Sequence, residues 1–171
     1  MNREVQEFNG NYFELEVYGI LQKAFPNSII IHNKELYSNF LGKNTQIDLI
    51  LIDRRGVFVI EAKGWREWIR GEYADFIWTG KSRAASVMKV KSPVNQNFLH
   101  IRTLRNAIRK RGYEPPEFHN LVVVPDDTSI MSKCLELCNT SSIVPKIQSL
   151  MSKSELCLCV EQLSELIGGI H

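Results

Sequence analysis

The sequence predicts an α/β protein in which helices flank one mixed β-sheet. Two apolar runs rich in β-branched residues, 46–53 and 56–63, are joined by a short polar turn and indicate an antiparallel hairpin. Segments with apolar residues at helical spacing stand on both sides of this hairpin. The order α-β-β-β-α-β, with helices again near the C-terminus, favours an α/β sheet, and the hairpin makes that sheet mixed.

The elements of the N-terminal half follow from apolar spacing. Residues 3–25 are expected to form a helix, which Pro26 stops. Its apolar stripe consists of Phe13, Val17, Ile20, Leu21 and Ala24. A short strand is expected at 28–32, and Arg54-Arg55-Gly56 is typical of a tight turn between the hairpin strands. Residues 67–90 mix aromatic and polar residues with glycines, which predicts short, irregular strands.

A helix is predicted to begin at Ser92, because Ser is a favoured N-cap and Pro93 suits the first helical position. Gly112 ends it. Its apolar stripe is Val94, Phe98, Ile101, Leu104 and Ile108. The remaining expected elements are a strand at 120–125, a helix near 142–152, a short strand at 156–159 and a final helix near 160–167.

Length and composition set the class of protein. The chain has 171 residues, of which 44% are hydrophobic and 23% charged, and it shows neither a repeat nor a low-complexity linker. We therefore expect a single domain over 1–171. No apolar run is long enough for a transmembrane helix, so no membrane partner is expected. The N-terminus lacks the hydrophobic stretch of a secretory signal, which predicts a cytoplasmic location.

The charge is distributed unevenly along the chain. The 21 Lys+Arg and 19 Asp+Glu residues give a net charge of +2, yet segment 81–111 holds nine basic residues and no acidic one. The basic residues of this segment are Lys81, Arg83, Lys89, Lys91, Arg102, Arg105, Arg109, Lys110 and Arg111. Such asymmetry indicates an anionic partner, and a solvated helix face with unmatched basic side chains remains the alternative.

The predicted hairpin brings acidic residues together. If Arg54-Arg55 is a two-residue loop, Asp48 lies directly opposite Glu61. Lys63 stands two positions after Glu61 and projects from the same face of the strand. Two close carboxylates repel each other unless a cation lies between them, and Mg²⁺ or Mn²⁺ suits such oxygen ligands. Lys63 would then orient the attacking water. A surface salt-bridge cluster is the alternative.

Two further polar residues are expected near this hairpin. Glu14 shares the helical stripe of Val17, Leu21 and Phe25, so it points toward the edge of the core. Gln96 lies in the first turn of the helix that follows Ser92, off its apolar stripe. The free N–H groups at that helix start can bind an anion such as phosphate.

A wider pattern resembles a known family. It consists of Gly10-x-x-Phe13-Glu14-x-x-Val17-x-x-x-Leu21, Gln46-Ile47-Asp48, Gly56-Val57-Phe58-Val59-Ile60-Glu61-Ala62-Lys63-x-Trp65 and Ser92-Pro93-x-x-Gln96. This pattern is similar to the NERD (nuclease-related) domain of the PD-(D/E)xK nuclease superfamily, over about residues 10–125, followed by an α/β extension at 126–171. Phe13 stands where the family often has Gly, and the stretch 71–91 is long and not clearly matched.

The resemblance implies a restriction-endonuclease-like core and a nuclease that cleaves nucleic acid, DNA before RNA. Asp48, Glu61 and the Ala62 carbonyl would hold the metal ion, and Lys63 would be the catalytic lysine. Glu14 would assist at the metal directly or through water, and Gln96 would act from the helix. The backbone phosphates would meet Lys81, Arg83, Lys89, Lys91, Arg102, Arg105 and Arg109. Cutting both strands together would need a homodimer.

The sequence is also compatible with two other functions. A non-catalytic nucleic-acid-binding or partner-docking module would keep the same fold without turnover, and a plain structural domain is a third alternative. Cys134, Cys138, Cys157 and Cys159 have spacings that are unusual for zinc and are expected to be reduced thiols. The four histidines form no ligand pattern. Trp65, Trp68 and Trp78 are expected to serve packing rather than base stacking.

Overall fold

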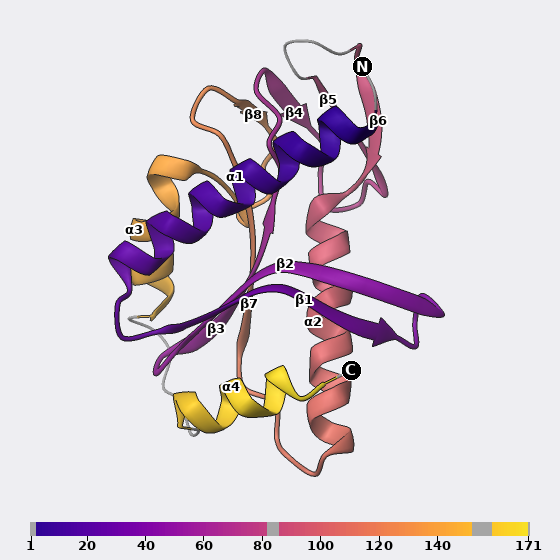
Figure 1. Ribbon diagram of the computed structural model, residues 1–171. Helices are drawn as coiled ribbons and strands as arrows, with labels where there is room; N and C mark the ends of the chain where they lie inside the picture. Colours follow the sequence, from indigo (N-terminus) through magenta and orange to yellow (C-terminus); the bar gives the residue numbers. More distant parts are fainter. Residues whose placement is uncertain (1–2, 82–85, 152–158, 171) are drawn as a thin grey trace.

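The computed structural model describes residues 3–81, 86–151 and 159–170. Within these residues the fold is α/β, with two β-sheets and four α-helices (Figure 1). The larger sheet has the strand order β1-β2-β3-β7-β9. Its strands are β1 (Ile29–Ser38), β2 (Lys43–Asp53), β3 (Gly56–Ala62), β7 (Phe118–Val124) and β9 (Leu137–Asn139). The predicted mixed sheet is confirmed, because β1–β2 and β2–β3 pair antiparallel, whereas β3–β7 and β7–β9 pair parallel.

Helices cover both faces of this sheet (Figure 1). The helices are α1 (Arg3–Ala24), α2 (Pro93–Lys110), α3 (Thr140–Met151) and α4 (Val160–Gly168). One core packs α1 and α3 against the side chains of Leu49, Leu51 and Phe58. The other packs α2 and α4 against Ile50 and Ile52. Because neighbouring residues of β2 enter opposite cores, both faces of the strand are apolar and its sequence is a continuous hydrophobic run.

The described residues also form a second, smaller sheet of four strands (Figure 1). Its strands, in spatial order, are β6 (Met88–Lys91), β5 (Ile77–Lys81), β4 (Trp68–Arg70) and β8 (Ser129–Met131). Trp78 is 1% exposed in the core of this sheet. Gly71 permits that packing, because an added Cβ would lie only 2.2 Å from the Trp78 ring. The stretch 67–90 therefore forms short strands, as its composition predicts.

The β2–β3 hairpin has the predicted register. Asp53 pairs with Gly56 and Leu49 pairs with Ile60, which leaves a two-residue turn and sets Asp48 opposite Glu61. Ladder pairing stops at Leu49, and the Ala62 N–H donates to Asp48 Oδ2 at 2.8 Å. The Asp48 carboxylate is therefore held against the end of β3.

A change of strand direction accompanies this break in the ladder. Asn33 has a positive φ of 54° and lies between His32 and Lys34, which pair with Leu49 and Ile47 on β2. Ile47 and Leu49 are two positions apart but enter different cores, so β2 twists at Asp48. The end of β1 and the start of β2, residues 34–47, form an arm that runs past α2 (Figure 1). The twist leaves room at the end of β3 for polar side chains.

Several elements differ from expectation. The first strand extends to Ser38 instead of ending near 32, because polar residues of the arm hide its pattern. Strands β8 and β9 were not expected, since each has only three residues. The strand expected at 156–159 falls mostly on residues outside those described. Among the described residues, none of the helices is long and apolar enough to cross a membrane.

Candidate active site

The candidate site lies where β2, β3, α1 and the start of α2 meet. Asp48 lies on β2 at the twist, Glu61 near the end of β3, and Lys63 directly after β3. Lys63 Nζ lies 2.5 Å from Glu61 Oε1, so the two side chains share a face, as their spacing predicts. The structure thus brings together Asp48, Glu61 and Lys63, as the predicted hairpin register implies.

Glu61 is a charged residue inside the protein. Its side chain is 1% exposed, and its Oε1 accepts from both Lys63 Nζ and Gln96 Nε2, the latter at 2.7 Å. Its second oxygen, Oε2, is buried and has no hydrogen-bond partner among the described residues. A buried carboxylate oxygen without a donor is costly, so Oε2 has the capacity to accept a further hydrogen bond or to hold a cation.

The acids of the site hold protons more tightly than usual. Burial, and then the negative charge of Glu61, raises the pKa of Asp48 to about 7. Burial also raises the pKa of Glu61, although Lys63 opposes the shift. For Lys63, burial alone would lower the pKa, but Glu61 and Asp48 together raise it above its usual value. Lys63 is therefore a cation at neutral pH, and the cluster is short of positive charge.

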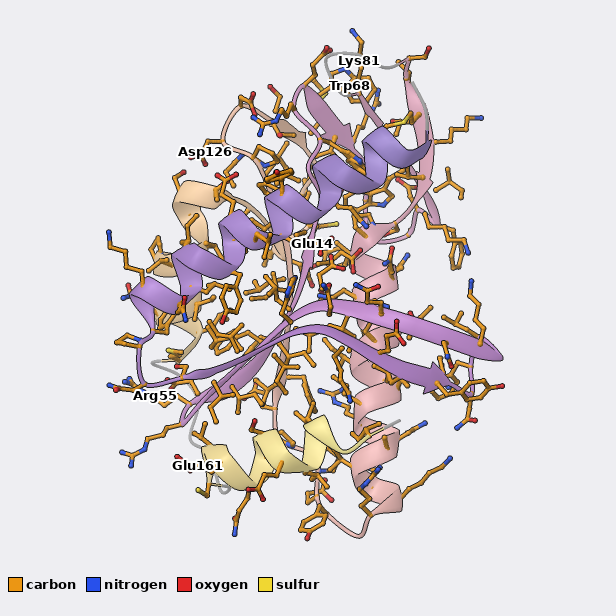
Figure 2. The ribbon with its side chains drawn as sticks, in the orientation of Figure 1. Glu14, Arg55, Trp68, Lys81, Asp126 and Glu161 are labelled. Atoms are coloured by element: carbon orange, nitrogen blue, oxygen red, sulfur yellow. The ribbon has the colours of Figure 1, made fainter. Side chains whose placement is uncertain are left out.

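Glu14 reaches the site from α1. Its side chain is 13% exposed, and Glu14 Oε2 lies 3.6 Å from His32 Nε2 on β1. Burial, followed by the charge of Asp48, raises the pKa of Glu14. Figure 2 shows Glu14 between α1 and the strands, whereas Arg55 lies at the far turn of the β2–β3 hairpin. Its position on the apolar stripe of α1 therefore places Glu14 at the edge of the core, whereas Glu16 of the same helix is exposed.

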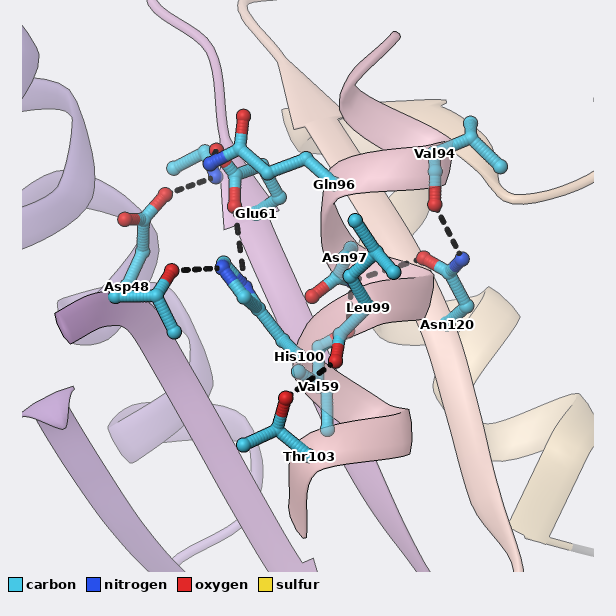
Figure 3. A network of polar contacts seen from close by, with 12 residues as sticks. Asp48, Val59, Glu61, Val94, Gln96, Asn97, Leu99, His100, Thr103 and Asn120 are labelled. Atoms are coloured by element: carbon cyan, nitrogen blue, oxygen red, sulfur yellow. Dashed lines mark hydrogen bonds and ion pairs between the residues drawn. The ribbon is translucent and has the colours of Figure 1, made fainter. Parts of the chain in front are cut away.

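The first turns of α2 form the opposite wall. Ser92 caps the helix by accepting from the Asn95 N–H, and Pro93 occupies the first turn, as predicted. Gln96 and His100 are four residues apart, so both side chains point toward Glu61 (Figure 3). His100 is 1% exposed; its Nε2 lies 2.9 Å from Thr45 Oγ1, and its Nδ1 lies 3.8 Å from Glu61 Oε2. Burial, and then Lys63, lowers the pKa of His100 to about 4.

Asn97 fixes this helix to the sheet. It is fully buried, and its Nδ2 donates to Val59 O, Asn120 Oδ1 and Leu121 O at 2.7, 2.8 and 3.0 Å. These acceptors belong to β3 and β7, so one side chain connects α2 to two adjacent strands (Figure 3). The neighbouring residue, Gln96, is thereby held at a constant distance from Glu61.

The donor chemistry of the site fits a hard divalent cation. The available groups are carboxylate oxygens, including the unpartnered Glu61 Oε2, and the raised pKa values show that added positive charge would be favourable. No three His, Cys, Asp or Glu side chains in the described part of the chain form a complete ligand group. Mg²⁺ is commonly held by one or two carboxylates and completed by water, so Asp48 and Glu61 meet its needs.

Comparison with known proteins places the chain in a family. A family model described as the nuclease-related domain matches residues 9–125, which is more than half of the chain. The chain belongs to the nuclease-related domain family. The predicted resemblance and its approximate limits are thereby confirmed. An uncharacterized protein of Bacillus anthracis is 34% identical over 113 residues, which cover 65% of this chain and 52% of that protein. The chain spans about half the length of this relative.

The nuclease-related match includes the candidate site in full. Glu14, Asp48, Glu61, Lys63 and Gln96 all fall inside residues 9–125. The match ends after β7, so β9, α3 and α4 lie beyond it. Even so, α3 and α4 pack on the same sheet as the matched strands.

The described basic residues that are predicted to meet nucleic acid lie on three elements of this nuclease-related domain, β5, β6 and α2. Lys89 and Lys91 are exposed on β6, close to the start of α2. Lys81 is paired with Glu67 at 2.9 Å, and Arg102 lies over the Phe40 ring at 3.7 Å. Arg105 and Arg109 lie farther along α2, and Arg83 is outside the described residues. Lys89 and Lys91 are therefore the basic residues of this set nearest to the start of α2.

Other residues singled out in the sequence have structural places. Trp78 is buried and donates its indole N–H to the Glu72 carbonyl, and Trp65 packs against the same core. Cys134 and Cys138 are buried free thiols, Cys159 is an exposed free thiol, and Cys157 lies outside the described residues. The packing interpretation of the tryptophans agrees with the places of Trp65 and Trp78.

Sequence reasoning missed His100 as a member of the site. The histidines form no metal-ligand pattern in the sequence, and His100 belongs to the site because its position on α2 turns it toward Glu61. The available signal was its spacing of four from Gln96, which puts both on one face of α2. His32 was missed for a different reason, because its proximity to Glu14 depends on how β1 packs beside α1.

Proposed function

We propose that the protein is a divalent-metal-dependent nuclease that hydrolyses phosphodiester bonds in nucleic acid, with DNA favoured by the family resemblance. The observation that carries this proposal is Glu61, a buried carboxylate whose Oε1 accepts from Lys63 and Gln96, while its Oε2 faces His100 Nδ1 at 3.8 Å without a hydrogen bond. An apolar sheet end has no structural need for such a cluster, and its charges are costly without a ligand. Clusters of this kind are typical of functional sites.

Asp48 and Glu61 would hold Mg²⁺ or Mn²⁺, with the Ala62 carbonyl as a further ligand and Glu14 acting through water. When bound, the ion would supply Lewis-acid stabilisation of the charge that develops on the phosphate. Glu61 is prepared for this role by its two donors, which occupy Oε1 and leave Oε2 free. Gln96 thus serves as a positioning residue for the carboxylate.

Lys63 would contact the reacting groups. Glu61 and Asp48 raise the pKa of Lys63 in the metal-free protein, so its side chain carries a positive charge there. Its ammonium group would donate to the attacking water and orient it toward phosphorus. The water oxygen would form the new P–O bond and release a proton to solvent, while the bond to the leaving oxygen would break and that oxygen would take up a proton from solvent. Lys63 would stabilise the negative charge on the phosphoryl oxygens.

The nucleic acid would approach along the start of α2. Lys89 and Lys91 are exposed there, and their ammonium groups favour a phosphate. Arg102, Arg105 and Arg109 lie along the same helix, which has 18 residues and is about 27 Å long. They would contact phosphates farther along the strand.

Cleavage assays test the proposal directly. The wild-type protein is incubated with single- and double-stranded DNA and RNA in Mg²⁺, in Mn²⁺ and with a chelator, beside Lys63→Ala and Asp48→Asn. We expect metal-dependent cleavage by the wild type and a loss of at least about 100-fold in each variant. Glu16→Gln, on the exposed face of α1, is the matched control and should cleave like the wild type.

Two outcomes would overturn the assignment. Equal cleavage by the wild type and both variants would show that the activity arises elsewhere. Tight, salt-sensitive binding without cleavage under every metal condition would identify a non-catalytic nucleic-acid-binding module instead.

A further inference from the structure

A pocket of about 500 Å³ adjoins the candidate active site. Three parts of the chain line it: the β1–β2 arm, the segment that enters β5, and the start of α2. Residues that matter for its chemistry are Leu41, Lys43, Phe76, Lys91, Gln96 and His100. Its volume falls in the range of pockets that take small organic ligands.

The pocket and the acid cluster share a wall. Gln96 and His100 line the pocket on one side, and on the other Gln96 Nε2 donates to Glu61 Oε1 while His100 Nδ1 faces Glu61 Oε2. An occupant would therefore lie one side chain away from Glu61. That distance suits a nucleotide that neighbours the phosphate held at the cluster.

The pocket lining favours a base with a phosphate beside it. Leu41 and Phe76 offer apolar surface, and Phe76 is 82% exposed, so the face of its ring is open for stacking. Lys43 and Lys91 bring two ammonium groups, and no acidic side chain is among the described residues that line the pocket. An aromatic ring combined with basic residues is the usual arrangement for unpaired nucleotides.

The wall that carries Phe76 is fixed before any ligand binds. The Ser92 N–H, at the start of α2, donates to the Phe76 carbonyl at 2.9 Å. Ile77, the next residue, pairs with Lys91 in the β5–β6 ladder. Phe76 is therefore presented by a rigid backbone, which lowers the entropy cost of binding.

We infer that this pocket binds an unpaired nucleobase of the substrate, with Phe76 stacking on the base and Lys43 and Lys91 contacting the adjoining phosphates. This inference rests on the proposed function and names its substrate class, which is a single-stranded nucleic acid or a strand with an unpaired segment. A base inside a duplex reaches such a pocket only after unstacking and unpairing, which costs a few kcal/mol. The pocket therefore selects against fully paired DNA.

Binding without divalent ions tests the inference separately from cleavage. Fluorescence anisotropy compares a labelled single-stranded DNA, the same sequence as RNA, and the fully paired duplex. We expect the wild type to bind a single strand at least about tenfold more tightly than the duplex. Phe76→Ala should lose about tenfold in single-strand affinity and leave duplex affinity unchanged.

Three further variants sharpen this test. Phe76→Trp should keep the affinity, because it retains a stacking ring. Tyr113→Ala is the matched control, since Tyr113 is 52% exposed beyond the far end of α2. Lys43→Gln combined with Lys91→Gln should reduce the slope of log affinity for the single strand against log salt by about 1.4.

The outcomes separate the two proposals. Single-strand preference that is lost in Phe76→Ala, without cleavage in any metal, would uphold the pocket and overturn the nuclease. Metal-dependent cleavage with unchanged single-strand binding by Phe76→Ala would uphold the nuclease and overturn the pocket. Equal affinity of the wild type for the duplex and the single strand would also overturn the assignment of the pocket. The DNA and RNA probes show which sugar the pocket accepts.

Discussion

Asp48 illustrates how one residue combines structure and chemistry. Its carboxylate accepts the Ala62 N–H at 2.8 Å, which completes the end of β3 where ladder pairing stops. Burial raises the pKa of the same carboxylate to about 7, and the nearby negative charge of Glu61 adds to the shift. The hydrogen bond holds Asp48 in a place where its charge is unfavourable without a cation.

The raised pKa of Asp48 predicts how the free energy of unfolding of the metal-free protein depends on pH. The pKa of Asp48 is about 7 in the folded state and about 3.9 in an unfolded chain. Between these values the folded state binds more protons, so stability falls as pH rises from about 4 to about 7. Asp48→Asn keeps an oxygen for the Ala62 N–H and removes the charge. We expect it to raise the free energy of unfolding by about 2 kcal/mol at pH 8, and by little near pH 4.

Thermal unfolding with a chelator measures this effect, and Glu16→Gln is the exposed control. Addition of Mg²⁺ or Mn²⁺ at pH 8 should raise the Tm of the wild type more than that of Asp48→Asn, because binding to the folded state stabilises it. A lower Tm of Asp48→Asn than of the wild type at pH 8 would contradict the argument.

At the scale of elements, α2 connects the site, the pocket and the sheet. Its first turns supply Gln96 and His100 to the acid cluster, and its middle packs on the same core as α4. The position of the helix depends on Asn97, whose amide donates to acceptors on β3 and β7. Displacement of α2 would separate Gln96 from Glu61.

Asn97→Ala is expected to destabilise the protein by about 1–3 kcal/mol, because buried acceptors on two strands lose their donor. Urea denaturation followed by tryptophan fluorescence measures the change. Asn106→Ala is the control, since Asn106 is half-buried farther along the same helix. Should Asn97→Ala unfold at the same urea concentration as the wild type, the Asn97 amide does not contribute to holding the helix on the sheet.

At the scale of the whole molecule, the C-terminal helices complete the fold that the family model covers only in part. Leu163 and Ile167 of α4 are buried in the same core as Ile50 of β2. Ile143 and Ile147 of α3 pack in the other core, with α1. Both faces of the larger sheet therefore depend on residues beyond the matched segment.

Ile167→Ala should lower the free energy of unfolding of the whole chain by about 2–5 kcal/mol, since it leaves a cavity beside the central sheet. Urea titration followed by circular dichroism should show one transition that moves to lower concentration. Gln162→Ala, at an exposed position of α4, serves as the control. A separate early transition, with the main one unchanged, would instead show that α4 is an independent appendage.

Much of the site was predictable because it depends on local geometry. The β2–β3 register follows from a two-residue turn, and that register places Asp48 opposite Glu61. The spacing of two residues in a strand joins Lys63 to Glu61, and the stripe of α1 directs Glu14 to the edge of the core. Strands β8 and β9 were missed because three-residue strands carry too little pattern and form only by pairing with neighbours.

The sequence by itself determined the α/β class, the hairpin with its acids and lysine, and the capped helix that carries Gln96, because short-range rules govern each of them. The tertiary structure decided the burial of Glu61, the approach of His100 and the pocket beside Phe76. These features depend on the twist of β2 at Asp48 and on the docking of α2, which bring together residues far apart along the chain.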